Sequence, residues 1–179
     1  MNDAGTPEVE ALVASATRAP WLPAAERRRG PLLDRLAIEA LVPHRHPFLF
    51  LDRITRVDRA NAVIVCQYDV QPTDPLLAGH VPGRPAWPGV LQVEAVGQAG
   101  LCLRRLADNG SPGRFDAGVA LTHVLAARFI RPVRAAACVE IVTRAIDDGL
   151  FTILVGQCLQ HDVVCSVAAM RGIQKETGA

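Results

Sequence analysis

His80 and Glu94 are two titratable side chains whose surroundings in the sequence suit acid–base chemistry, and they stand fourteen residues apart. His80 begins a loop that ends at Gly89 and contains three prolines and two glycines, so the path of its backbone is restricted. Glu94 follows in a run of helix-forming residues that starts at Val90. An imidazole and a carboxyl group are the base and the acid needed to remove a proton beside a carbonyl and to release a leaving group.

The start of the same helix offers a third element of that chemistry. The backbone N–H groups of Gly89 and Val90 are candidate donors to an oxygen on which negative charge develops. Gln98 lies one turn beyond Glu94, on the same face of the helix. Each group also has an ordinary explanation, because a lone loop histidine is most often a surface residue and a helical glutamate commonly pairs with an arginine.

The helix is expected to be the centre of the domain. From Val90 to Leu103 its only polar residues are Gln92, Glu94 and Gln98. A helix that is apolar on every side is either buried in a protein or spans a membrane. This run of fourteen residues is short against the roughly 20 that a span needs, and it contains a carboxylate. We therefore expect a buried helix in a soluble domain.

Two segments of the chain resemble a known family. The first consists of Gly79-His80-Val81-Pro82-Gly83, Pro85, Pro88-Gly89-Val90-Leu91, Glu94-Ala95 and Gln98, and the second of Leu41-Val42-Pro43-His44-Arg45-His46-Pro47-Phe48-Leu49-Phe50-Leu51-Asp52-Arg53. In residue type and spacing they resemble the motifs of the β-hydroxyacyl-(acyl carrier protein) dehydratases of fatty-acid synthesis, the FabZ type. The resemblance covers residues 33–173.

The resemblance implies an α+β hotdog fold, in which an antiparallel sheet wraps around one long buried central helix. The residue pattern predicts a short helix over 32–41 and strands over 48–57, 62–70, 118–129, 136–146, 151–160 and 163–171. Compact turns at Asp147-Asp148-Gly149 and His161-Asp162 predict that the last three strands form an antiparallel meander.

The domain organisation that we expect is a single hotdog domain over residues 31–179, preceded by an extension over residues 1–30. In the extension Val9, Leu12, Val13 and Ala16 fall at helical spacing, and prolines follow at positions 20 and 23. The extension is therefore compatible with disorder, with a short helix, or with packing over a neighbouring subunit.

The resemblance also implies a reaction on a 3-hydroxyacyl thioester carried by the phosphopantetheine of an acyl carrier protein, without a cofactor. His80 would take the C2 proton, and Glu94 would donate a proton to the departing 3-hydroxyl group. Gly89 N–H would polarise the thioester carbonyl, and Gln98 would orient Glu94 or a bound water. In this family the histidine and glutamate of one site come from different subunits, which implies a homodimer and allows a trimer of dimers.

Three arginines, Arg128, Arg131 and Arg134, resemble the family's basic segment and are the expected docking surface for an acidic carrier protein. The chain departs from the family at Val81, where an aromatic residue is usual, and at Trp87, where a smaller residue is usual. We expect both to shape the acyl-binding site and to alter substrate preference, as in a polyketide-like pathway.

Other classes of function have less support in the sequence. The net charge of +1 gives no reason to expect nucleic acid, and the five cysteines are scattered, as expected of free thiols in the cytoplasm. His44 and His46 have the spacing of a metal-ligand pair, but no further ligand cluster supports a metal site. A hotdog thioesterase and a non-catalytic acyl-binding or scaffolding homologue remain the alternatives. An isomerising dehydratase would normally carry aspartate at position 94.

Overall fold

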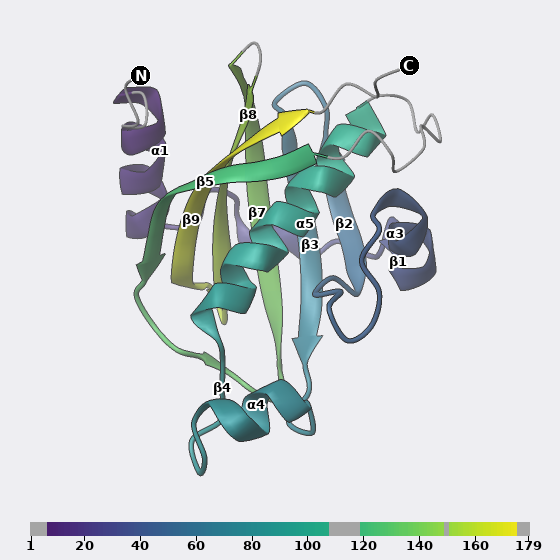
Figure 1. The fold of residues 1–179 in the computed structure, drawn as a ribbon, viewed down its shortest axis with the longest axis vertical. Coiled ribbons are helices and arrows are strands. Elements are labelled where there is room, and N and C mark those ends of the chain that lie inside the picture. The colour runs from purple at the N-terminus through teal and green to yellow at the C-terminus, as the bar shows by residue number, and fades with distance from the viewer. Residues whose placement is uncertain (1–6, 108–118, 149–150, 175–179) are drawn as a thin grey trace.

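The computed structural model describes residues 7–107, 119–148 and 151–174. The strands of its large sheet are β1 (Leu33–Asp34), β2 (Arg53–Asp58), β3 (Val63–Val70), β5 (Val119–Phe129), β7 (Ala137–Asp148), β8 (Phe151–Gln160) and β9 (Val163–Gln174). Within the described residues they form one antiparallel sheet in the order β1-β2-β3-β7-β8-β9-β5. Helix α5 (Gly89–Ala107) lies diagonally across one face of this sheet (Figure 1). The predicted α+β fold with a long central helix is confirmed.

The smaller elements surround this unit. They are α1 (Pro7–Arg18), α2 (Ala24–Arg27), α3 (Arg35–Leu41), α4 (Pro75–His80) and a short ladder of β4 (Ala86–Trp87) with β6 (Val133–Arg134). Figure 1 shows α4 and β4 together near the start of α5. In the described part of the chain, each helix is too short or too polar to span a bilayer.

The predicted meander of the last three strands is confirmed, since β7 pairs with β8 and β8 with β9. At the β8–β9 turn His161 and Asp162 have φ angles of 52° and 64°. Two successive residues with positive φ angles form a tight turn whose backbone twist matches the twist of the two antiparallel strands that it joins. The predicted turn over 147–149, between β7 and β8, lies partly outside the described residues.

Close packing brings α5 onto the sheet. A Cβ atom at Gly100 would lie 2.2 Å from Leu154 Cδ1, so glycine allows the helix to approach the β8 side chain. Other positions of α5 are less completely covered: Val90 is 71% exposed, and Val93, Gly97 and Leu101 are half-buried. A single chain therefore leaves part of the apolar surface of its central helix exposed, although the sequence predicts a helix that is buried all round.

The second predicted strand begins later than expected, at Arg53 instead of residue 48. The backbone of residues 48–50 bonds to the side chain of Gln98 and not to a neighbouring strand, because Gln98 accepts from Phe50 N and donates to Phe48 O. The predicted helix over 32–41 is likewise shorter. It starts at Arg35 after Asp34, whose carboxylate accepts a hydrogen bond from Ala37 N.

The N-terminal segment packs on the face of the sheet opposite α5. Val9, Val13 and Ala16 of α1 share a buried cluster with Val155 and Val167, among others, whereas the alternating residues of the same strands face α5. Arg27 of α2 is 1% exposed, and its guanidinium contacts Glu140, Asp162 and Leu22 O. These contacts join α2 to β7 and to the β8–β9 turn.

The cysteines are free thiols, four of them buried and Cys138 half-buried. Burial raises the pKa of Cys102 and of Cys158 to about 12 and that of Cys138 to about 11. A thiol with so high a pKa has almost no thiolate near neutral pH, so these three side chains act as apolar residues and not as nucleophiles.

Candidate active site

His80 is the last residue of α4, and a neighbouring carbonyl orients its ring. Asp74 caps the start of the helix by accepting a hydrogen bond from Leu76 N at 2.9 Å, and Pro75 follows it. His80 Nδ1 lies 3.0 Å from Ala86 O. Because a carbonyl oxygen can only accept, Nδ1 carries a proton in this contact, and in the neutral imidazole Nε2 then keeps its lone pair. The exposed imidazole therefore presents Nε2 as a base.

Glu94 lies in the second turn of α5, with its side chain 30% exposed. Its Oε1 accepts a hydrogen bond from Gln98 Nε2 at 2.9 Å, the contact expected from their spacing on the helix. Gln98 is fully buried, and its bonds to Phe48 O and Phe50 N measure 2.8 and 2.9 Å. One amide therefore holds both the 48–50 backbone and one oxygen of the Glu94 carboxylate.

His44 is a site residue that the sequence pattern suggested only as a metal ligand. Its Nε2 lies 3.3 Å from Glu94 Oε1, and its ring stacks on that of Phe48 with centroids 6.4 Å apart. Among the described residues there is no group of three His, Cys, Asp or Glu side chains that could hold a metal ion. His44 belongs to the second motif segment, and that was the available signal, but nothing in its spacing connects it with Glu94.

The start of α5 has free backbone donors. Leu91 N and Gln92 N donate to Pro88 O at 3.1 and 3.3 Å. In the described part of the chain, the N–H groups of Gly89 and Val90 have no hydrogen-bond partner. These are the first donors of the helix, where the dipole also favours negative charge, so they can stabilise an oxyanion.

Gly89 also lies in close contact with Phe129, the last residue of β5. A Cβ atom at Gly89 would lie 2.6 Å from Phe129 Cε1, closer than side chains tolerate. The end of β5 is thus pressed against the start of α5, and only glycine leaves room for the Phe129 ring in this position.

Gly89→Ala should therefore lower the free energy of unfolding by about 1 kcal/mol, the low end for overpacking, because the new methyl group displaces the Phe129 ring and that ring is 56% exposed. The double variant Gly89→Ala/Phe129→Ala should lose less than the sum of the two single losses, since it removes both sides of the clash. Urea denaturation measures all three values. Gly79→Ala is the matched control, because a Cβ there meets nothing within 4 Å. Strictly additive losses would contradict the contact.

His80 and Glu94 do not meet within one chain. Among the described residues, no hydrogen bond and no ion pair of 4.0 Å or less joins the two side chains. His80 contacts Ala86, whereas Glu94 faces Gln98 and His44. Within one chain the two side chains therefore have separate partners and do not bond to each other.

The two residues at which the chain departs from the family lie in different environments. Val81, directly after α4, is exposed. Trp87 is 2% exposed and packs against Phe50 and Tyr68 at centroid distances of 5.9 and 5.2 Å, where burial raises the pKa of Tyr68 to about 12. Trp87 is thus a core side chain of its own chain, and its role in substrate binding stays a prediction.

The predicted docking arginines lie on exposed backbone next to the His80 region. Arg128 is near the end of β5, Arg131 follows it, and Arg134 lies in β6; all three are exposed. In the β4–β6 ladder Arg134 pairs with Ala86, whose carbonyl orients His80. Arg134 therefore lies in the same small ladder whose Ala86 carbonyl contacts the candidate base.

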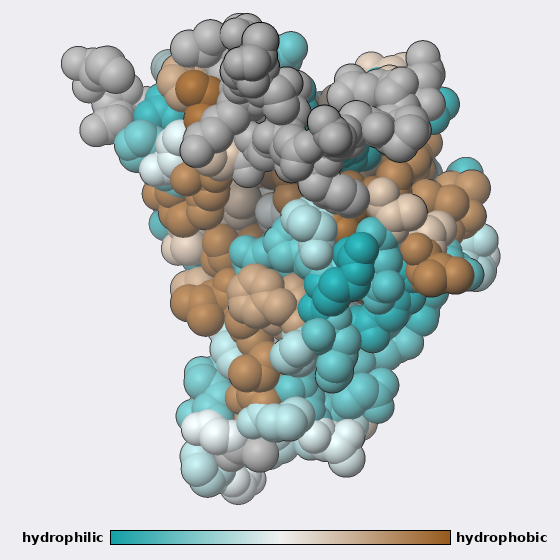
Figure 2. Space-filling view, turned by 45° about the vertical axis from the view of Figure 1, so that its right-hand side comes forward, coloured by the Kyte–Doolittle hydropathy of each residue, from teal (hydrophilic) through white to brown (hydrophobic). Residues whose placement is uncertain are grey.

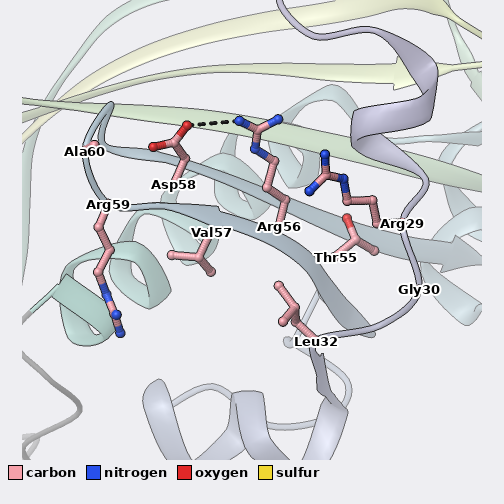
Figure 3. Close-up of a pocket in the computed structure, with 9 residues that line it drawn as sticks. All are labelled: Arg29, Gly30, Leu32, Thr55, Arg56, Val57, Asp58, Arg59 and Ala60. Carbon is pink, nitrogen blue, oxygen red and sulfur yellow. Dashed lines mark hydrogen bonds and ion pairs between the residues drawn. The ribbon is translucent and has the colours of Figure 1, made fainter.

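A separate groove of about 730 Å³ lies between residues 29–32 and the β2–β3 turn (Figure 3). Arg29, Arg56 and Arg59 line it, and Arg56 is bonded to Asp58. It contains none of the predicted site residues, so the chemistry proposed for His80 and Glu94 does not involve it.

Comparisons with known proteins identify a family and similar sequences. The model of the FabA-like domain matches residues 42–161. The chain is 29% identical over 145 residues to the 3-hydroxyacyl-(acyl-carrier-protein) dehydratase FabZ of Campylobacter concisus, covering 79% of this chain and 97% of the relative.

Solved structures share the fold at lower identity. The dehydratase heterocomplex ApeI:P from Xenorhabdus doucetiae superposes with a TM-score of 0.64 at 18% identity, over 83% of this chain and 93% of that one. A thioesterase from Haemophilus influenzae superposes with a TM-score of 0.53 at 15% identity, over 71% of this chain and 80% of that one. The FabA-like model spans most of the chain, and the sheet and central helix are those of its structural neighbours, so the chain belongs to the FabA-like family and has a hotdog fold.

Proposed function

We propose that the protein is a (3R)-hydroxyacyl-(acyl carrier protein) dehydratase, a hydro-lyase that converts a 3-hydroxyacyl thioester into the trans-2-enoyl thioester. The observation that carries the proposal is the hydrogen bonding of His80 and Glu94, which leaves one nitrogen and one oxygen available for proton transfer. The Ala86 carbonyl leaves His80 Nε2 as a base, while Gln98 holds one oxygen of Glu94 and leaves the other for proton transfer. Membership of the FabA-like family and the similarity to a FabZ dehydratase support the same reaction.

In the proposed reaction His80 Nε2 removes a proton from C2 of the substrate. The negative charge that develops on the thioester oxygen is stabilised by the N–H groups of Gly89 and Val90 at the start of α5. The C3–O bond breaks as the Glu94 carboxyl group gives its proton to the departing hydroxyl, which leaves as water. The products are the enoyl thioester, an imidazolium and a carboxylate, and one proton transfer restores the starting state. Acid–base groups supply every step, so the proposal includes no cofactor.

The proposal includes a homodimer in which Glu94 of one subunit faces His80 of the other. Three features support it: the two side chains do not meet in one chain, α5 leaves Val90 71% exposed, and β5 is an eleven-residue edge strand with exposed Leu121 and Val124. An open edge with apolar side chains is suited to pairing with another chain. Figure 2 shows apolar and hydrophilic surface side by side on one face of the molecule. Further assembly into a trimer of dimers is compatible with this arrangement.

Charge reversal at Arg128 or Arg131 should weaken turnover of the carrier-bound substrate more than turnover of a small thioester mimic. The reason is that the acidic carrier protein, but not the mimic, contacts the basic segment. The variants should therefore have a higher KM for the carrier-bound substrate, and their difference from the wild type should become smaller at high salt. Arg144→Glu is a control, because Arg144 lies on β7 over the Trp21 ring and outside this segment. Equal losses on both substrates would count against docking at this surface.

Mass spectrometry of hydroxyacyl carrier proteins of several chain lengths tests the reaction itself. Loss of water from the carrier-bound acyl group is the expected result, and release of a free acid would identify a thioesterase instead. Binding of acyl chains without either product would identify a non-catalytic homologue. The length that reacts fastest reports the effect of Val81 and Trp87, and distinguishes fatty-acid synthesis from a polyketide-like pathway. We place this reaction in the cytoplasm.

A further inference from the structure

His44 and Gln98 approach the same oxygen of Glu94 from two different parts of the chain. Gln98 Nε2 donates to Oε1 at 2.9 Å from within α5, and His44 Nε2 lies 3.3 Å from Oε1 on the segment that follows α3. Among the described residues, Oε2 of Glu94 has no hydrogen-bond partner. The two oxygens of this carboxyl group therefore differ: one is approached by two nitrogen atoms and the other is free.

The position of His44 is set by its own loop. Arg45 Nη1 donates to Val42 O at 2.9 Å and to His44 O at 2.8 Å, which closes the backbone around the histidine. The His44 ring stacks on Phe48, whose carbonyl accepts a hydrogen bond from Gln98. The loop is thus attached to α5 through the same amide that holds Glu94, so the imidazole and the carboxylate are held in one rigid unit.

We propose that His44 is a positioning residue that, together with Gln98, fixes Oε1 of Glu94 so that Oε2 carries the proton transferred to the departing hydroxyl. This inference rests on the proposed dehydratase function. A carboxylate oxygen can only accept, so His44 Nε2 carries a proton in this contact. The 3.3 Å distance is long for a hydrogen bond, and contacts of this kind often tighten when substrate is bound. Without His44, one donor remains on Oε1 and the carboxyl group samples more orientations.

Kinetics of three variants test the proposal on carrier-bound substrate. His44→Phe keeps a ring for the stack on Phe48 but removes the donor, and it should lower kcat about tenfold or more with KM changed less than about twofold. His44→Gln places an amide donor near the position of Nε2 and should recover most of the loss. His46→Phe is the matched control on the same loop, because His46 is exposed, and it should leave kcat unchanged.

Three outcomes would overturn the proposal: an unchanged kcat in His44→Phe, a loss confined to KM, or His44→Gln no better than His44→Phe. Thermal melting of each variant shows whether it is folded, and His44→Gln decides the question if His44→Phe is not. A separate measurement needs no activity: in ¹⁵N NMR spectra of the wild type, His44 should be protonated at Nε2, with a resonance that shifts in Glu94→Ala. No shift there overturns the contact. Absence of turnover by the wild-type protein overturns instead the dehydratase function, and the two failures are thus distinguishable.

Discussion

His80→Ala and Glu94→Gln should each lower kcat for dehydration by about 10²–10⁴-fold, because each removes one of the two groups that move protons in the transition state. KM should change little, since neither side chain is placed to bind the body of the acyl chain. Initial rates of enoyl-thioester hydration, the reverse reaction, measure both effects by absorbance. Both variants should melt at nearly the wild-type temperature, because His80 is exposed and Gln at position 94 keeps the shape of Glu94.

Mixing these two inactive variants tests whether the site is shared between subunits. Unfolding and refolding an equal mixture should recover about a quarter of the wild-type activity, since half of the dimers contain both variants and each of these has one intact site of two. The control is each variant refolded alone, which should stay inactive. No recovery in the mixture, with dimers shown to form, would mean that His80 and Glu94 of one chain serve the same site. Near-normal hydration by either variant alone would contradict the assignment of that residue.

Arg27→Met should lower the free energy of unfolding by about 3 kcal/mol, the lower end of the range for removing one partner of a buried ion pair. Arg27 is 1% and Glu140 5% exposed, so the variant leaves a carboxylate in the protein interior. The loss is moderated because Arg28 still contacts the other oxygen of Glu140. In a chain of this size the melting temperature should fall by roughly 6–12 °C.

Arg28→Met is the matched control for this experiment. Arg28 contacts the same two acids, Glu140 and Asp162, but its side chain is 45% exposed, so the change should cost less than about 1 kcal/mol. Arg27→Met/Glu140→Leu removes both charges and should recover part of the Arg27→Met loss. Equal melting temperatures for Arg27→Met and Arg28→Met would mean that α2 does not dock against β7 in solution.

Much of the fold could be predicted because it depends on local pattern. The start of α5 follows from Pro88-Gly89 and the helix formers after it, and the meander follows from alternating strands joined by short turns. The errors arose where a side chain competes with the backbone for hydrogen bonds. Gln98 bonds to the 48–50 backbone, so β2 starts only at Arg53, and no propensity of residues 48–52 could reveal a partner that lies some fifty residues away.

The candidate site was likewise predictable from the sequence only in part. Sequence alone was enough to single out His80, Glu94, Gln98 and the donors at the start of α5, because motif spacing and helical periodicity depend on neighbours in the chain. Contacts between distant segments decided which nitrogen of His80 is available as a base and which oxygen of Glu94 has no partner. They also placed His44 beside the other oxygen of Glu94 and buried Trp87. Such contacts arise when α5, the loop after α3 and the β4–β6 ladder pack together, and no local pattern encodes their distances.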